Sequence, residues 1–317
     1  MSAASSTPVT DFVSELQFTA KTRGYLPRGL AIAATVIIIL MLVLILGNVV
    51  IHGFGAISWE FLSKAPEQGL EAGGIFPAIV GTLFLVLLMV ITGVPIGVLT
   101  AIYLQEYTSP DSKITRVIRI AINNLAGVPS IVFGLFGLGF FIGFIGNNID
   151  SLVLRSETPV WGQPAIIWAS LTLALLTLPV VIISTEEALK TIPRELKDAS
   201  YALGATKLQT IVRVLIPQAL PGIFTGAILA VSRGAGEVAP IMFTGAAYYL
   251  PYLPSKLTDQ FMELGYHVFV MATQSPDVEK TLPILYGTVL VLLVLTFLLN
   301  FVAILIRSRI RSRRVSA

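Results

Sequence analysis

Long apolar runs dominate this chain and leave few folds open to it. Residues 30–51 contain no charged side chain. Further largely apolar stretches cover residues 75–104, 114–145, 165–183, 219–247 and 282–306. A run of about 20 apolar residues can cross the hydrocarbon core of a bilayer as an α-helix, which satisfies its own backbone hydrogen bonds. The sequence therefore predicts an all-α, polytopic membrane protein with six transmembrane helices.

The overall composition agrees with that prediction. Of the 317 residues, 55% are hydrophobic and 12% are charged, which leaves too little polar surface for a soluble globule. There is no cysteine, and the two histidines, His52 and His267, are far apart, so we expect no disulfide, no metal site and no cofactor. A P-loop requires a Gly-Lys dipeptide, which the chain lacks. We therefore expect no enzyme activity, and any ATP hydrolysis must come from a partner subunit.

The basic residues are distributed unevenly between the segments that connect the runs. If the polar segment 187–217 faces the cytoplasm, sixteen of the 21 Lys and Arg residues lie on the cytoplasmic side and Arg233 lies within a span. The four on the outside are Lys64, Arg155, Lys256 and Lys280. Connecting segments rich in Lys and Arg stay in the cytoplasm. Six spans with this bias predict that both termini are cytoplasmic.

Residues 187–217 form the only long polar segment with strongly apolar runs on both sides. Gly204 suits the C-terminal stop of one helix, and Thr206 with Gln209 has the spacing of a capping box that opens a second helix ending at Pro217. The pattern predicts a helical hairpin that exposes an apolar stripe. A DNA-binding helix-turn-helix has a similar pattern, but the spans that begin within a few residues of each end would hold this hairpin against the bilayer.

The hairpin resembles the cytoplasmic loop of binding-protein-dependent ABC transporter permeases. The consensus of that loop is Glu-Ala-Ala, three residues, Gly, nine residues, Ile, any residue and Leu-Pro. The matching positions here are Asp198, Ala199, Ser200, Gly204, Val214, Ile216 and Pro217. Several of these residues depart from the consensus, but the spacing is unchanged. The resemblance implies a type I ABC importer permease fold, with Asp198, Ala199, Ser200, Gly204 and Pro217 in its ATPase-coupling loop.

The middle of the run 114–145 is interrupted by polar and helix-breaking residues. Asn123 and Asn124 are followed by a glycine and a proline, and Ser130 comes directly after that proline. Irregular backbone at membrane depth is tolerated where it faces protein or a water-filled path. We therefore expect Asn123, Asn124 and Ser130 either to line a substrate pathway or to pack helices together.

Arg233 and Glu237 are charged residues within the expected span 219–247. Their spacing of four places them on one face of a helix. One interpretation is a neutral pair that only stabilises packing. The other is a transient anion site, in which the arginine fork binds a tetrahedral oxyanion and the glutamate limits trapping.

Four further segments resemble phosphate ABC transporter permeases of the PstA type. They are GGIFPAIVGTLFLV, INNLAGVPSIVFGLFGLGFF, RGAGEVAPIMFTGAAYY and HVFVMATQSPD. The resemblance implies a permease subunit of an ATP-driven, high-affinity phosphate importer in a bacterial or archaeal plasma membrane. It implies a second permease chain of the PstC type, two ATP-binding subunits and an extracytoplasmic phosphate-binding protein as partners. The intramembrane Arg and Glu of that family match Arg233 and Glu237.

The expected organisation has five parts. They are a cytoplasmic tail (1–29), an additional and retained transmembrane helix (30–51), a five-helix permease core (75–306), its coupling loop (187–217) and a basic cytoplasmic tail (307–317). Residues 257–274 are expected to form a helix on the outer surface. Two other functions stay open, namely a permease for sulfate, molybdate or phosphonate and an ion-driven secondary transporter.

Overall fold

The structure is a computed structural model that describes residues 9–67, 70, 72–109, 111–275 and 277–315. The chain divides into two compact units, Met1–His52 and Gly53–Ala317. Helix α1 (Val9–Gly53) makes up the described part of the first unit, so the predicted tail is helical from Val9 onwards. Its apolar side chains between Leu30 and Ile45 are exposed. A helix that is apolar on all sides and exposed is suited to lipid.

Six helices in the described part of the chain are long and apolar enough to cross a membrane. They are Pro27–Ala56, Phe76–Tyr107, Ser130–Leu154, Ile166–Lys190, Lys207–Gly234 and Val278–Arg309. The predicted number of spans is confirmed. The first, second, fourth and sixth cover the expected apolar runs, whereas the third and fifth differ from expectation.

The third span begins later than its apolar run. Helix α4 (Lys113–Leu125) is a separate helix that ends at the asparagine pair, and a turn containing Gly127 and Pro129 follows it. The span itself consists of α5 (Ser130–Phe136) and two π-helical segments, η4 (Gly137–Gly146) and η5 (Ile149–Leu154). The expected run 114–145 was wrong because Pro129 cannot continue a helix from α4, so the break separates two helices.

The fifth span begins and ends earlier than its apolar run. It starts in the hairpin with α8 (Lys207–Thr210), continues through η6 (Ile211–Leu215) and ends with α9 (Ile216–Gly234). The prediction that the second hairpin helix ends at Pro217 was wrong, because the helical backbone runs on from η6 through Pro217 into α9. Beyond Gly234 only α10 (Ala239–Met242) is helical before residue 247.

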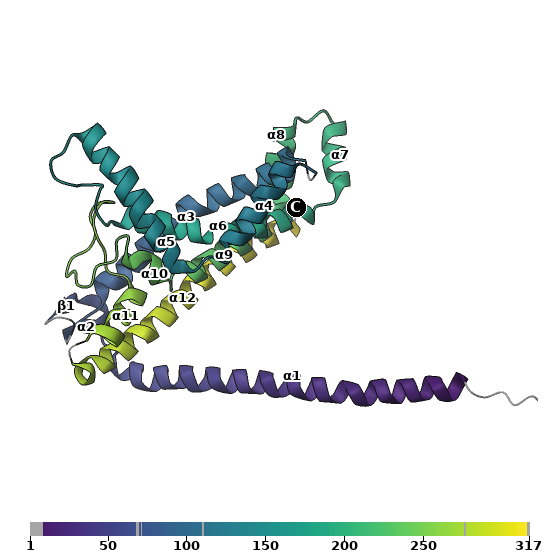
Figure 1. Ribbon diagram of the computed structural model, residues 1–317, viewed down its shortest axis with the longest axis horizontal. Coiled ribbons are helices and arrows are strands. Elements are labelled where there is room, and N and C mark those ends of the chain that lie inside the picture. The colour runs from purple at the N-terminus through teal and green to yellow at the C-terminus, as the bar shows by residue number, and fades with distance from the viewer. Residues whose placement is uncertain (1–8, 68–69, 71, 110, 276, 316–317) are drawn as a thin grey trace, which may run out of the picture. The chain divides into compact units, whose positions relative to one another are not determined.

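Three helices form the centre of the second unit. Helix α6 (Ile166–Lys190) packs along α3 (Phe76–Ile102) on one side and α9 on the other, and α12 (Val278–Val315) packs on α9 (Figure 1). Small residues let the backbones approach: a Cβ on Gly93 would lie 3.2 Å from the Cβ of Ala174. Packing of this kind holds helices together where lipid supplies no hydrophobic driving force.

The second unit has two ends, which we call the hairpin end and the sheet end (Figure 1). The hairpin end carries α7 (Arg194–Ala202), α8 and the π-helical η3 (Tyr103–Tyr107) that follows α3. The sheet end carries η1 (Phe54–Ala56), α2 (Trp59–Ser63), α11 (Leu264–Gln274) and the antiparallel strands β1 (Pro66–Glu67) and β2 (Ala72–Gly73). In the described part of the chain, these two strands and an isolated bridge between Ala246 and Phe261 are the β-structure of a mainly helical fold.

The expected helix within 257–274 is present as α11, with one face buried in the protein and its last three residues exposed. Leu264, His267, Val270 and Met271 are buried, because α11 packs against α12 and α3.

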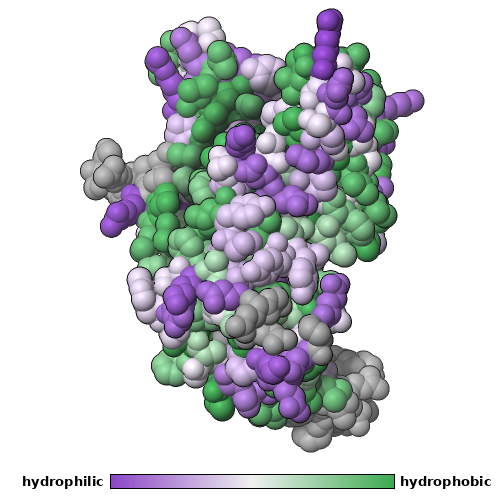
Figure 2. Space-filling view, turned by 90° about the vertical axis from the view of Figure 1, so that its left-hand side faces the viewer, coloured by the Kyte–Doolittle hydropathy of each residue, from purple (hydrophilic) through white to green (hydrophobic). Residues whose placement is uncertain are grey.

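On the face of the molecule that includes the sheet end, hydrophilic residues gather along the middle and hydrophobic residues lie on both sides of them (Figure 2).

Candidate substrate pathway and coupling hairpin

The charged pair Arg233 and Glu237 lies where helix α9 stops. Arg233 is the last residue but one of α9, and Glu237 follows the helix in a turn. The expectation that both residues share one helical face was wrong, because the α-helix ends at Gly234, three residues before Glu237. The side chains still meet: Arg233 Nε donates a hydrogen bond of 3.1 Å to Glu237 Oε1.

This pair is partly open rather than enclosed. The side chain of Arg233 is 35% exposed and that of Glu237 is 18% exposed. The only hydrogen bond of this guanidinium to the described residues uses Nε, so its terminal nitrogens stay available as donors. A guanidinium with free terminal donors can bind an oxyanion through two parallel hydrogen bonds.

The residues on either side of Arg233 fix the end of α9. Ser232 Oγ donates a hydrogen bond of 2.7 Å to Asn300 Oδ1 on α12. A Cβ on Gly234 would lie 2.4 Å from Met89 Sδ, so α9 packs closely on α3 at this point. Beyond the break, Ala235, Ile241 and Thr244 are buried, whereas Gly236 is exposed. Protein therefore covers this irregular backbone in part, and the remainder is open beside the charged pair.

The three polar residues predicted on the third span are not all brought to Arg233. Asn123 and Asn124 lie on α4 and are exposed, whereas Ser130 opens α5 and is half-buried. Helix α5 packs against α10, the short helix just after Glu237, and α4 packs against α6. Of the three, Ser130 therefore begins the helix that lies closest to the turn with Glu237.

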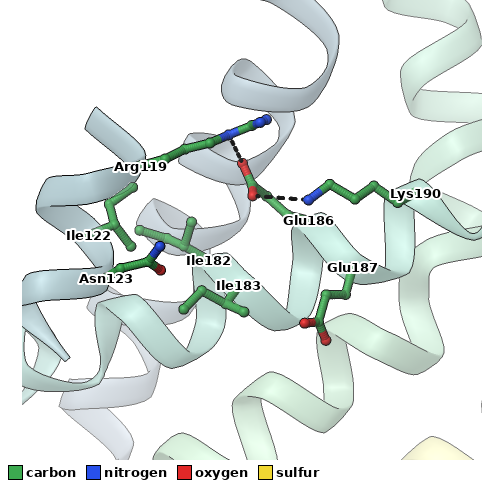
Figure 3. A pocket seen from close by; sticks show the side chains of 8 residues that line it. All are labelled: Arg119, Ile122, Asn123, Ile182, Ile183, Glu186, Glu187 and Lys190. Atoms are coloured by element: carbon green, nitrogen blue, oxygen red, sulfur yellow. Dashed lines mark ion pairs between the residues drawn. The ribbon is translucent and has the colours of Figure 1, made fainter. Parts of the chain in front are cut away.

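Asn123 instead lines a cavity between α4 and α6 that contains a second group of charges. Arg119 Nε lies 3.4 Å from Glu186 Oε1, and Lys190 Nζ lies 3.7 Å from Glu186 Oε2 (Figure 3). Sequence analysis missed this group, because the apolar run ends at residue 183 and Glu186 looks like part of the polar hairpin. The spacing of four between Glu186 and Lys190 is the one signal in the sequence that could have indicated it.

The predicted hairpin is present, with its corner at Gly204. Gly204 has φ +81°, a conformation that side chains with a Cβ rarely adopt, and no atom lies within 4 Å of where its Cβ would be. Thr206 and Gln209 form the predicted capping box at the start of α8. Ser200 Oγ and Thr210 Oγ1 share a hydrogen bond of 2.9 Å that joins α7 to α8.

The hairpin is anchored on one side and exposed on the other. Ile192, Ile211 and Leu215 are buried against Ile102 at the end of α3, and Lys197 pairs with Glu106 of η3. Of the matched loop residues, Asp198 and Ala199 are exposed, Ser200 is half-buried and Pro217 lies in α9. Leu203 is 89% exposed, and Leu196 and Tyr201 are also exposed. This apolar surface on a hairpin fixed at its base is suited to a partner protein.

Two buried ionisable residues at the sheet end were also missed by sequence analysis. Glu263 caps α11 by accepting a hydrogen bond of 2.6 Å from the Tyr266 backbone N–H, and His267 lies one turn later. Burial raises the pKa of Glu263 to about 7 and lowers the pKa of His267 to about 4. Glu263 Oε1 and His267 Nδ1 have no hydrogen-bond partner among the described residues. Beside Glu263, the Leu264 backbone N–H donates a hydrogen bond of 3.0 Å to Thr82 Oγ1, which fixes the start of α11 against α3.

Known proteins are similar to this chain in sequence and in fold. Residues 93–315 match the family described as binding-protein-dependent transport system inner membrane component. The probable ABC transporter permease protein YqgI of Bacillus subtilis is 32% identical over 82% of this chain and 87% of that protein. The phosphate transport system permease protein PstA of Mycobacterium leprae is 38% identical over 63% of this chain and 62% of that protein. The chain therefore spans less than two thirds of the length of the M. leprae relative.

A solved bacterial alginate ABC transporter has a similar fold. It matches with a TM-score of 0.64 and 14% identity, covering 90% of this chain and 95% of that one. Six long apolar helices and a protruding hairpin thus define a polytopic permease with the type I ABC importer fold. The chain belongs to the family of binding-protein-dependent transport system inner membrane components.

Proposed function

We propose that this chain is the transmembrane permease subunit of an ATP-driven importer of inorganic phosphate. The observation that carries the proposal is the partly exposed guanidinium of Arg233 at the point where α9 ends inside the protein. An anion that crosses a low-dielectric passage needs a compensating charge. Similarity to phosphate transport permeases supports phosphate as that anion.

Glu237 gives the site its transient character. Its carboxylate holds Arg233 through one hydrogen bond at 3.1 Å and competes with an incoming anion for the guanidinium. Transport requires binding that is strong enough for entry and weak enough for release. A lone buried arginine would retain phosphate, whereas a paired one returns to its carboxylate partner after the anion leaves.

The proposed partners follow from the exposed surfaces and from the family. Two ATP-binding subunits hydrolyse ATP, and one docks on the hairpin around Asp198, Ala199 and Gly204. A second permease chain of the PstC type completes the passage, and an extracytoplasmic phosphate-binding protein delivers the substrate. In this assembly the hairpin transmits the closure of the ATPase to the helices, because α8 continues into α9 and so reaches Arg233.

The proposed orientation places the hairpin end and both termini in the cytoplasm. The sixteen basic residues on that side support it, including Lys190, Arg194, Lys197, Lys207 and Arg213 of the hairpin. Cysteines that replace Ser200 and Ser63 in turn provide the test. An impermeant thiol reagent applied to intact cells should label the Ser63→Cys variant only, and labelling of Ser200→Cys would reverse the orientation.

The experiment that tests the function is uptake of labelled phosphate into proteoliposomes that contain the full complex and ATP. Phosphate import should stop when ATP is depleted at a clamped proton gradient, which an ion-driven secondary transporter would survive. Unlabelled phosphate should compete, whereas sulfate, molybdate and phosphonate should not. Stronger competition by one of those three would change the proposed cargo.

A further inference from the structure

The cavity between α4 and α6 brings together two cationic side chains, Arg119 and Lys190, and two carboxylates, Glu186 and Glu187. Its volume is about 190 Å³, several times the ~30 Å³ that a water molecule occupies in the liquid. Cationic, anionic and amide groups line it together with an apolar wall, and its lining residues are Arg119, Ile122, Asn123, Ile182, Ile183, Glu186, Glu187 and Lys190. Figure 3 shows Arg119, Glu186 and Lys190 together on one side of the cavity, with the carboxylate of Glu187 directed away from them.

The charges in this cavity are only loosely paired. Glu186 is nine-tenths buried, yet its contacts with Arg119 and Lys190 are 3.4 Å and 3.7 Å, longer than the roughly 2.7–2.9 Å of a charge-assisted hydrogen bond. Arg119 Nε and Glu186 Oε1 are both buried without a hydrogen-bond partner among the described residues. A buried donor and acceptor without hydrogen bonds cost stability, so a ligand that satisfies both is bound favourably.

The ligand that fits must accept hydrogen bonds and also donate one. Lys190 and the Arg119 nitrogens other than Nη2, which donates to the Leu104 carbonyl at 3.3 Å, offer donors to anionic oxygens. The Glu186 carboxylate can only accept. Phosphate keeps at least one proton at neutral pH and can therefore donate to Glu186, and phosphate monoesters do so in part, with a second pKa near 6. Sulfate keeps no proton, so its oxygens would face the carboxylate as like charges.

We propose that this cavity is a second phosphate site, in which Arg119 and Lys190 hold the anionic oxygens and Glu186 accepts the hydrogen bond of a protonated oxygen. Asn123, one turn after Arg119 on α4, supplies a further polar group. Lys190 is the last residue of α6, so the site lies at the hairpin end and opens there through its half-exposed side chain. Its assignment to the carried phosphate rests on the proposed function. A phosphomonoester lipid headgroup has the same chemistry and is the other source of the ligand.

The test measures binding of labelled inorganic phosphate to the full complex in phosphatidylcholine nanodiscs, without the binding protein. All variants carry Arg233→Gln, which removes the first site. Saturable binding should persist in this background, and excess sulfate should not displace it. Adding Arg119→Gln together with Glu186→Gln should weaken binding by about tenfold or more. This double change removes both buried charges at once, so neither is left unpaired.

A matched control is Arg116→Gln, which removes an exposed arginine of α4 that does not line the cavity. It should leave binding unchanged. Glu186→Gln alone should let sulfate compete, because an amide can donate to a deprotonated oxyanion. A parallel series in nanodiscs containing phosphatidate separates the two sources, since a lipid ligand would displace phosphate only while Arg119 and Glu186 are present.

The proposal is overturned if neither phosphate nor phosphatidate binding depends on Arg119 and Glu186, or if sulfate competes as well as phosphate in the parent. These results are independent of transport. Absence of phosphate uptake by the wild-type complex would overturn the proposed function, while leaving the binding result in place.

Discussion

Two buried glutamates, one at each end of the second unit, show how the same residue serves different purposes. Glu186 at the hairpin end is 7% exposed and lies beside cations from two helices, Arg119 and Lys190. Glu263 at the sheet end is 1% exposed and interacts with neutral hydrogen-bond donors, including the Tyr266 backbone N–H. Burial is nearly equal, so the partners make the difference. Glu186 thus has charged partners at the hairpin end, whereas Glu263 at the sheet end has neutral ones and a pKa raised to about 7.

The largest effect should come from breaking the corner of the hairpin. Gly204→Val places a β-branched residue at φ +81°, a backbone strain of about 1–3 kcal/mol that misdirects α8. We expect the permease to remain in the membrane while recovery of the ATP-binding subunits on purification falls several-fold. Gly204→Asn is the matched control, because asparagine tolerates this conformation and nothing lies within 4 Å of the new Cβ. Equal recovery with both variants would remove the hairpin end from the partner interface.

The next effect should come from leaving Glu186 without its nearer cation. Arg119→Gln should destabilise the permease by about 1–3 kcal/mol, because a buried carboxylate loses a charged partner and keeps only Lys190 at 3.7 Å. Adding Glu186→Gln should restore most of that loss. Thermal unfolding in detergent measures both variants. If the single and double variants unfold alike, Glu186 is not held by Arg119.

At the sheet end, Glu263→Gln should change how stability depends on pH. The pKa of Glu263 is raised to about 7, so the folded state binds more protons than the unfolded state between pH 4.5 and 7. The contribution of Glu263 to stability is therefore present at low pH and is lost as the pH rises through 7. Relative to Glu263→Gln, the wild type should lose stability over that interval.

His267 changes the free energy of unfolding with pH in the opposite direction, so its contribution must be distinguished from that of Glu263. Its lowered pKa means that the folded state keeps it neutral, so its contribution is lost as the pH falls from about 6.5 towards 4. The difference between Glu263→Gln and wild type cancels this contribution, since both contain His267. Glu60→Gln, an exposed change at the same end, is the control and should show no such difference. A flat difference curve would mean that Glu263 is charged throughout.

The smallest effect should come from Thr206→Ala at the hairpin end. The capping box would lose its hydroxyl acceptor for the Gln209 backbone N–H, which costs about 1 kcal/mol of helix stability. Hydrogen exchange should rise locally in α8 and leave α6 unchanged. Thr191→Ala, whose hydroxyl donates to the Ala188 carbonyl, is the control. Faster exchange throughout the membrane helices would show that the hairpin is not a local unit.

The sequence predicted what depends on nearby residues. The six spans, the capping box at Thr206, the corner at Gly204 and the break before Ser130 all arise from hydropathy or local turn chemistry. The same reasoning failed at Pro217, where the helix continues from η6 through the proline into α9. It also placed Glu237 on a helix, although Gly234, Gly236 and Pro240 interrupt this run and α9 does stop at Gly234.

The features that sequence analysis missed depend on tertiary packing and have no local sequence pattern. Arg119 and Glu186 are 67 positions apart, as their numbering shows, and they meet only because α4 folds onto α6. Glu263 and His267 become buried because α11 packs against α3 and α12, although their own segment looks like a surface helix. Placing such residues requires the arrangement of the helices.

The central claim, that Arg233 carries the anion, is tested most directly by phosphate uptake into proteoliposomes that contain the full complex and its binding protein. Uptake is normalised to assembled permease. Arg233→Gln should abolish uptake, Arg233→Lys should retain part of it because the planar fork is lost, and Glu237→Gln should reduce it less. Arg155→Asn, an exposed change at φ +49°, should leave it unchanged. Wild-type uptake by Arg233→Gln would contradict the account and reduce the pair with Glu237 to a packing contact.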